Sequence, residues 1–188
     1  TAVDGEWNYA PGYKLFDTIF KEMPDINIIV EDLGDLRPEV LELRDHYEFK
    51  GMRIVQFCFT ENDVADGEYT DTHNLVLYTG THDNETLVSW YQTITAAERA
   101  MVRDYLYDYA TPEEQLYKSM IALVLRSAAA TCIIPMQDWL GLDNSARINK
   151  PSTVGENWRW RLKKTQLTKK LQKEICRMTT RYGRMNWE

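Results

Sequence analysis

Two acidic residues follow apolar segments, and their side chains could carry acid-base chemistry. Glu31 comes directly after Ile-Ile-Val at 28–30, and Asp83 lies in a Thr-Gly-Thr-His-Asp-Asn turn that follows Leu-Val-Leu-Tyr at 75–78. A carboxyl at the rim of a hydrophobic wall is favoured in its protonated form, which a general acid requires. The neighbouring His82 can donate a hydrogen bond to a sugar hydroxyl while Asp83 accepts one from another hydroxyl.

Each of these residues also has an ordinary structural interpretation. Glu31 and Asp32 can cap the turn before the next helix, and Asp83 can be the N-cap of a helix that begins shortly after it. A lone histidine is more often a hydrogen-bonded structural residue, and His46 is interpreted in that way. His82 differs because it lies in a loop at the end of a strand, where functional residues are frequent.

The elements that must position these residues are expected from periodicity. Residues 13–23 form an amphipathic helix closed by Pro24, and Pro38 begins a second helix. Short apolar runs predict strands at residues 27–30, 53–59, 75–78 and 132–134. Strands that alternate with helices indicate an α/β fold with parallel βα units. Because chemistry in such sheets gathers at the carboxyl ends of strands, Glu31 and Asp83 stand where a site is expected.

The second half of the chain is predicted to be mostly helical. Capping boxes from Thr95 to Glu98 and from Thr111 to Glu114 predict helices that start near Ala96 and Pro112. The helix after Pro112 is apolar on most faces, which predicts burial. Residues 165–181 carry leucine and isoleucine at four-residue spacing, with lysine and arginine elsewhere, and predict a solvated terminal helix.

Composition excludes several classes of protein. The 22 Lys and Arg residues against 29 Asp and Glu give a net charge of −7, which argues against nucleic-acid binding. Hydrophobic residues make up 44% of the 188-residue chain, as in folded globular proteins, yet no run is long enough for a membrane span. The chain begins at Thr1 without an initiator methionine, so we expect it to be a piece of a larger protein.

Cysteine and histidine usage predicts neither a disulfide framework nor a metal site. The three cysteines are an odd number without CxxC spacing, which favours reduced thiols in a cytoplasmic protein. The three histidines are scattered and form no metal-ligand pattern. We therefore expect no metal.

Five segments resemble one enzyme family in the family's own order. They are Glu-Asp-Leu-Gly at 31–34, Gly-Met-Arg-Ile-Val-Gln-Phe at 51–57, Tyr-Thr-Gly-Thr-His-Asp-Asn at 78–84, Ile-Pro-Met-Gln-Asp at 134–138 and Asn-Trp-Arg-Trp-Arg at 157–161. Together they are similar to the 4-α-glucanotransferases called amylomaltases or disproportionating enzymes, relatives of the α-amylases. The resemblance spans nearly the whole chain.

The resemblance implies a (β/α)₈ barrel that transfers α-1,4-glucan segments between maltooligosaccharides with retention, without cofactor or metal. By position, Glu31 would be the general acid and base, and Asp83 would stabilise the transition state through the hydroxyls of a distorted glucose. The resemblance implies further sugar contacts from Asp32, His82 and Asn84.

Two departures from the family's pattern stand out. The family's nucleophile is an aspartate in an Arg-x-Asp-His-Phe segment before the strand of Glu31, and the 188 residues contain no such segment. Arg-Asp-His-Tyr at 44–47 has the wrong spacing and lies within a predicted helix. In addition, Ser152 stands where the family has glycine.

We therefore expect residues 1–188 to form a partial catalytic domain, the C-terminal half of the barrel with about strands 5 to 8 and extra helices. Its expected partners are glucan, the missing N-terminal half, or a second copy, because a half barrel leaves sheet edges and apolar surface exposed. Two other functions stay open: an α-glucan hydrolase of the α-amylase clan, and a noncatalytic α-glucan-binding module that uses the chain's aromatic residues.

Overall fold

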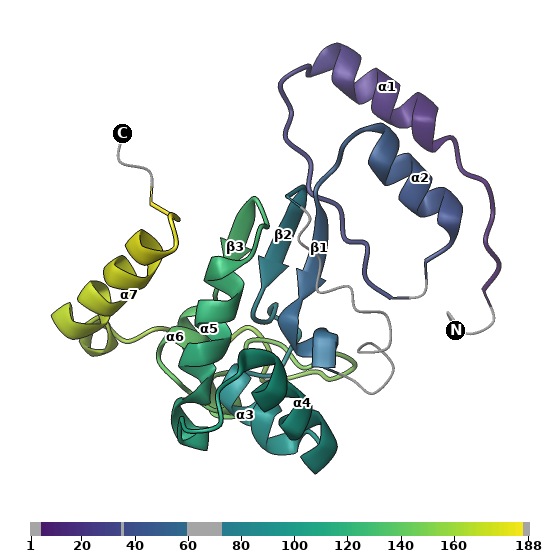
Figure 1. Cartoon of the computed structure of the whole chain (residues 1–188). Coiled ribbons are helices and arrows are strands. Elements are labelled where there is room, and N and C mark those ends of the chain that lie inside the picture. Colours follow the sequence, from purple (N-terminus) through teal and green to yellow (C-terminus); the bar gives the residue numbers. More distant parts are fainter. Residues whose placement is uncertain (1–4, 35, 60–72, 186–188) are drawn as a thin grey trace. The chain divides into compact units, whose positions relative to one another are not determined.

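The structure is a computed structural model that describes residues 5–34, 36–59 and 73–185. The chain divides into two units, Thr1–Gly51 and Met52–Glu188. Both units contain helices, and the three strands of the described residues form one sheet, so the chain has a mixed α/β fold (Figure 1).

The first unit contains two helices, α1 (Gly12–Glu22) and α2 (Pro38–His46), and both confirm the prediction. Its packing is built from aromatic rings, because neither helix carries a fully buried residue. Phe16 on α1 meets Phe49 with ring centroids 4.7 Å apart, and Phe20 stacks on Tyr47 at 5.7 Å. The hydroxyl of Tyr47 also donates a hydrogen bond to Asp17 Oδ1 at 2.8 Å, which fixes α1 against the segment after α2.

The strand predicted at residues 27–30 is wrong as a full element. Only Ile29 pairs, in a single parallel bridge with Lys50, and the Val30 amide donates to the Lys50 carbonyl at 2.9 Å. Ile29 itself is 47% exposed. Within this unit, one bridge is too little pairing to hold a longer strand.

The second unit is built on a three-stranded sheet in the order β1 (Gly51–Ile54), β2 (Leu75–Tyr78), β3 (Thr131–Ile133). β2 and β3 are parallel, with Leu77 opposite Cys132. All of β2 except Tyr78 is buried, as expected of a strand covered on both faces. The predicted strands at 75–78 and 132–134 are therefore confirmed, the second with a shift of one residue.

The strand predicted at residues 53–59 is wrong beyond Ile54. Residues Val55–Phe59 turn into a 3₁₀ helix, η2, in which Val55, Gln56 and Phe59 are buried. A short apolar run does not distinguish a strand from a buried helical turn, and here the burial follows helical spacing.

Helix α5 (Leu116–Arg126) lies at the centre of the second unit. It carries six buried residues and contacts α3 (Leu87–Thr93), α4 (Ala96–Leu106), α6 (Met136–Trp139) and α7 (Lys169–Arg181). This confirms the burial predicted for the helix after Pro112. Three 3₁₀ turns, η4 (Glu113–Gln115), η5 (Asn144–Ala146) and η6 (Lys164–Gln166), complete the order of elements.

Only one of the two predicted capping boxes forms. Thr95 and Glu98 cap α4 reciprocally, as expected. At the second position Pro112 is extended and makes no side-chain cap, so η4 precedes α5 and the helix starts at Leu116. The cause is tertiary: Arg103 holds the Thr111 carbonyl at 2.6 Å and the Asp108 carbonyl at 3.0 Å, which fixes this loop in another conformation.

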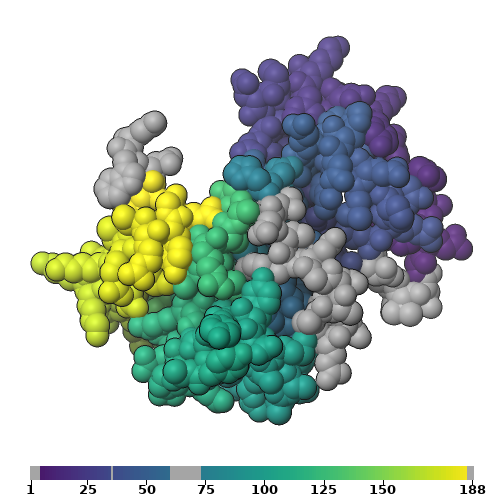
Figure 2. Space-filling view, viewed as in Figure 1, coloured from purple at the N-terminus to yellow at the C-terminus, as the bar shows by residue number. Residues whose placement is uncertain are grey.

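The terminal helix α7 begins at Lys169, four residues later than predicted, with Thr168 as its N-cap. It lies against α5, where Lys118 pairs with Glu174 at 2.7 Å. Beyond α7, Arg184 donates to the main-chain carbonyls of Leu125 and Ala129. Figure 2 shows these C-terminal residues, in yellow, against the green surface of the same unit.

The three cysteines are free thiols. No helix among the described residues has the length and apolar character needed to cross a membrane.

Candidate active site

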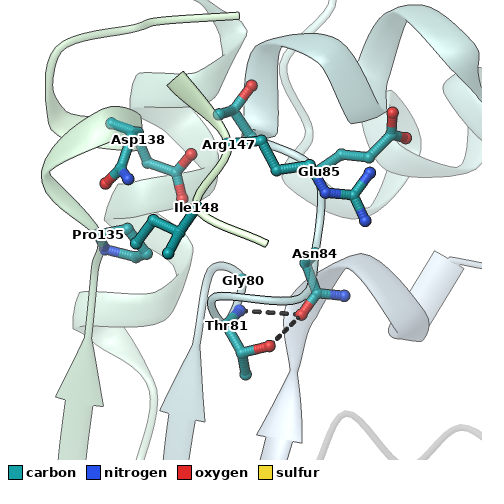
Figure 3. Close-up of a pocket in the computed structure, with 10 residues that line it drawn as sticks. Gly80, Thr81, Asn84, Glu85, Pro135, Asp138, Arg147 and Ile148 are labelled. Atoms are coloured by element: carbon teal, nitrogen blue, oxygen red, sulfur yellow. Dashed lines mark hydrogen bonds between the residues drawn. The ribbon is translucent and has the colours of Figure 1, made fainter. Parts of the chain in front are cut away.

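The turn after β2 is held rigidly by its own side chains. Asn84 Oδ1 accepts from the Thr81 amide at 2.9 Å and from the Thr81 hydroxyl at 2.7 Å (Figure 3). Gly80 precedes them at a close approach, because a Cβ there would lie 2.8 Å from Gln56 Nε2. The same Gln56 amide donates to the Glu85 carbonyl at 2.8 Å, so η2 is hydrogen-bonded to the residue that follows the turn.

The buried carboxylate of Asp138 ties three elements together beneath this turn. Asp138 is 2% exposed; its Oδ2 accepts from the Thr79 hydroxyl at 2.5 Å and its Oδ1 from the Leu87 amide at 2.8 Å. Thr79 directly follows β2, Leu87 starts α3, and Asp138 itself belongs to α6 after β3. Burial raises the pKa of this carboxyl to about 6, against the opposing effect of its two hydrogen bonds.

A small cavity separates Asp138 from the turn. It has a volume of about 20 Å³ and is lined by Gly80, Pro135, Arg147 and others (Figure 3). Such a space holds about one water molecule, so it cannot accept a sugar. A ligand larger than a water molecule would therefore have to meet the turn on its outer side.

Asp83 lies on that outer side and is fixed by a neighbouring segment. Its Oδ1 accepts from Asn149 Nδ2 at 2.5 Å, and its main-chain carbonyl accepts from Arg147 Nη2 at 2.5 Å. His82 Nε2 lies 3.3 Å from the same Oδ1. The Asp83 side chain remains 47% exposed. One carboxylate oxygen is thus held by the protein while the residue stays accessible to a ligand.

His82 stands beside an exposed indole. Its ring centroid is 5.0 Å from that of Trp158, and Trp158 is 55% exposed. Trp158 takes a left-handed φ of 64°, and its amide donates to the Ile148 carbonyl at 2.7 Å. An exposed ring pair next to a carboxylate can present both a flat apolar face and hydrogen-bonding groups to one ligand.

An open cleft of about 690 Å³ lies on the same side of this unit. Polar side chains such as Arg147, Asn149 and Asn157 line it, together with Trp160. Its size suits a ligand of several rings rather than a single small ion.

The capping interpretation of Asp83 is wrong, because Thr86 is the N-cap of α3 and accepts from the Ser89 amide. The N-cap of α2 is Arg37, which makes no side-chain cap, so neither Glu31 nor Asp32 caps that helix; that these two residues cap the turn before it stays a prediction.

In the first unit, Glu31 is exposed. The Asp32 carboxylate forms an ion pair with Arg44 at 2.6 Å and is only 8% exposed. A Cβ at Gly51 would collide with this carboxylate, so any larger residue there would displace the Asp32 side chain. Arg44 to His46 lie in α2, as expected, and not at a strand end.

The structure thus brings His82, Asp83 and Asn84 together in one turn, while Glu31 and Asp32 belong to the other unit. Sequence reasoning missed Asp138, Arg147 and Asn149 as supports of the turn. One signal for Asp138 was available in the sequence: it follows β3 as Asp83 follows β2. Arg147 and Asn149 lie in an irregular segment, where no periodicity marks them.

Among the described residues, no cluster of three or more His, Cys, Asp or Glu side chains could hold a metal ion.

A family model described as 4-alpha-glucanotransferase matches residues 1–168. The chain belongs to the 4-alpha-glucanotransferase family. It is 42% identical over 190 residues to the 4-alpha-glucanotransferase of Streptococcus pneumoniae. This alignment covers 99% of the chain and 37% of the Streptococcus pneumoniae protein. The Thermus thermophilus 4-alpha-glucanotransferase is 40% identical over 168 residues, covering 86% of this chain and 34% of that one.

A solved structure agrees with the sequence comparison. The amylomaltase from Streptococcus agalactiae in complex with acarbose superposes with a TM-score of 0.86 and 34% identity. The match covers 97% of this chain and 37% of that one. The chain therefore has the fold of one part of an amylomaltase, and it spans little more than a third of the length of these 4-alpha-glucanotransferases.

Proposed function

We propose that this chain is the acid-base and transition-state-binding part of an enzyme that transfers α-1,4-glucan segments between maltooligosaccharides with retention. In this proposal residues 1–188 form the C-terminal half of a (β/α)₈ barrel, with about strands 5 to 8. Family membership and the share of the relatives that the chain spans support it. The observation that carries it is Asp83, a half-exposed carboxylate held by Asn149 beside His82 and Trp158.

Glu31 has two roles in the proposed mechanism. Its protonated carboxyl gives a proton to the leaving glycosidic oxygen as the bond to the donor glucose breaks. Its carboxylate then removes the proton from an incoming sugar hydroxyl, which attacks the same carbon and restores the original stereochemistry. The exposure of Glu31 in its unit leaves it accessible for both steps.

Retention requires a second carboxylate that forms the covalent glucosyl-enzyme intermediate, about 5–5.5 Å from the acid. The Arg-x-Asp-His-Phe segment expected to carry it is not among the 188 residues. We propose that it belongs to the part of the relatives that this chain does not span, so that this remaining part is the chain's first partner. Self-association of the chain alone is the second.

Asp83 acts by accepting hydrogen bonds from hydroxyls of the distorted glucose, and these bonds strengthen as positive charge develops in the ring. His82 and the Asn84 amide nitrogen donate to neighbouring hydroxyls. Asn84 has its oxygen engaged with Thr81, so its amide nitrogen is the group left for a sugar.

Asp32 is proposed to contact substrate as well, but its ion pair with Arg44 competes for the same carboxylate oxygen. We also propose that the site binds acarbose, the compound named with the Streptococcus agalactiae amylomaltase.

The test uses a complete enzyme in which this chain replaces the matching region of the Streptococcus pneumoniae 4-alpha-glucanotransferase. This chimera should redistribute maltotriose into shorter and longer chains, and added glucose should increase the redistribution. Glucose release that added acceptor does not divert would favour the hydrolase. A chimera that binds maltooligosaccharides without turnover, and whose binding Glu31→Gln leaves unchanged, would favour the binding module.

A further inference from the structure

We infer that Arg147 and Asn149 are positioning residues for the Asp83 carboxylate; the inference rests on the role proposed above for Asp83. Three hydrogen bonds join residues 147–149, here called the strap, to two consecutive residues of the turn. Asn149 Nδ2 donates to Asp83 Oδ1 at 2.5 Å and the Asn149 amide donates to the His82 carbonyl at 3.0 Å. Arg147 Nη2 donates to the Asp83 carbonyl at 2.5 Å.

The strap is anchored independently of Asp83. Arg147 Nε donates to the Asn149 carbonyl at 2.9 Å, which sets the spacing between the two residues. Before the strap, the carbonyl of buried Ala146 accepts from the buried amide of Gln137 at 3.2 Å. After it, Trp158 holds the Ile148 carbonyl. The strap therefore links the exposed carboxylate of Asp83 to buried residues that hold it in place.

The chemistry of the two side chains suits this purpose. Asn149 fixes one oxygen of Asp83 with a neutral donor, so the negative charge that must meet the developing oxocarbenium ion is not cancelled by a cation. Arg147 binds the main-chain carbonyl, and its charge supports the backbone position of Asp83. The other titratable group that faces Asp83 among the described residues is His82, at 3.3 Å.

A half-exposed aspartate without such a donor has several side-chain conformations available. Displacement of a catalytic group by about 1 Å can cost about 10²-fold in rate. We therefore expect Asn149→Ala to lower kcat of the chimera by about 10²-fold with little change in KM, because the carboxylate is still present but misplaced.

The test compares Asn149→Ala with Asn149→Asp. The second variant has nearly the same size but puts a carboxylate against Asp83, and two carboxylates so close cannot both be ionised. A shared proton restores the donor at low pH. The ratio of variant to wild-type kcat should therefore rise at least about tenfold from pH 8 to pH 5 for Asn149→Asp. For Asn149→Ala the ratio should stay level between the two pH values.

Arg147→Ala should also lower kcat, by about tenfold. Arg99→Ala is its matched control: Arg99 lies in α4, donates to the main-chain carbonyl of Gln92 at 3.4 Å and lines neither the cavity nor the cleft, so this variant should leave kcat unchanged. Circular dichroism and urea midpoints of each variant verify that the fold is retained.

A double-mutant cycle with Asp83→Asn gives the decisive comparison. If the strap acts through Asp83, then adding Asn149→Ala to Asp83→Asn should lower kcat by less than a further factor of about three. The inference would be overturned if the kcat losses of the two single variants multiply in the double variant. It would also be overturned if kcat of Asn149→Asp and of wild type depend on pH in the same way. If Asp83→Asn alone leaves kcat unchanged, the proposed function of Asp83 fails instead, so the two failures are distinguishable.

Discussion

The buried carboxyl of Asp138 predicts a specific pH dependence of stability. Burial raises its pKa in the folded chain to about 6, from an ordinary value of 3.8. Between these values the folded state binds the proton more tightly than the unfolded state, so the free energy of unfolding falls as pH rises. The full difference of about 2 pKa units corresponds to about 3 kcal/mol, of which about 2 kcal/mol falls between pH 4.5 and pH 7.5.

Asp138→Asn removes this titration while keeping both contacts. The amide oxygen still accepts from the Leu87 amide, and the amide nitrogen can donate to the Thr79 hydroxyl that now donates to Asp138. Relative to wild type, the variant should therefore gain about 2 kcal/mol of stability when pH is raised from 4.5 to 7.5.

The assay is urea unfolding of the 188-residue chain and the variant at both pH values. Asp143→Asn is the control: the pKa of Asp143 is lowered by its hydrogen bonds to Ser145, so its contribution is lost as pH falls and the slope has the opposite sign. The reasoning would be refuted if the difference in free energy of unfolding between Asp138→Asn and wild type is the same at both pH values.

Three further predictions follow from the fold and the proposed function. The 188-residue chain alone should show no transfer of maltotriose, because it lacks the expected nucleophile, and measurable turnover by the purified chain would contradict this. Ser152→Gly should raise the free energy of unfolding by about 0.5 kcal/mol, because Ser152 has a φ of 61°, whereas Ser152→Ala, with the same strain, should not. Thr95→Ala should lower it by about 1 kcal/mol through loss of the α4 capping box, measured by urea unfolding against wild type.

The sequence predicted those elements whose signals are local. The helix at Pro38 and the capping box at Thr95 depend on neighbouring residues alone, and both form. The strand at 75–78 is buried and central in the sheet, so its apolar run was informative.

The predictions that failed depended on partners distant in the chain. The apolar run at 53–59 fits a strand and a buried 3₁₀ turn equally, and contacts with the Glu85 carbonyl decide between them. The capping signal at Thr111 is overridden by Arg103, which no local pattern reveals.

The site shows the same division. The turn at 78–84 was singled out from its residue types and its place after a strand, and the structure places it directly after β2. The strap could not be predicted, because Asn149 is 66 residues away from Asp83 and lies in irregular structure. Ser152 marks another limit: its left-handed φ explains why glycine was expected there, but not why serine is present.

The central claim of the proposal is the division of roles, with Glu31 as the proton donor and Asp83 as a transition-state stabiliser. The measurement is the first turnover of the chimera with α-maltosyl fluoride, whose leaving group needs no proton, compared with maltotriose. Glu31→Gln should lose about 10³-fold with maltotriose but keep fluoride release within about tenfold of wild type. Asp83→Asn should lose rate with both substrates. Equal losses for Glu31→Gln with the two substrates, or no loss with maltotriose, would contradict the account.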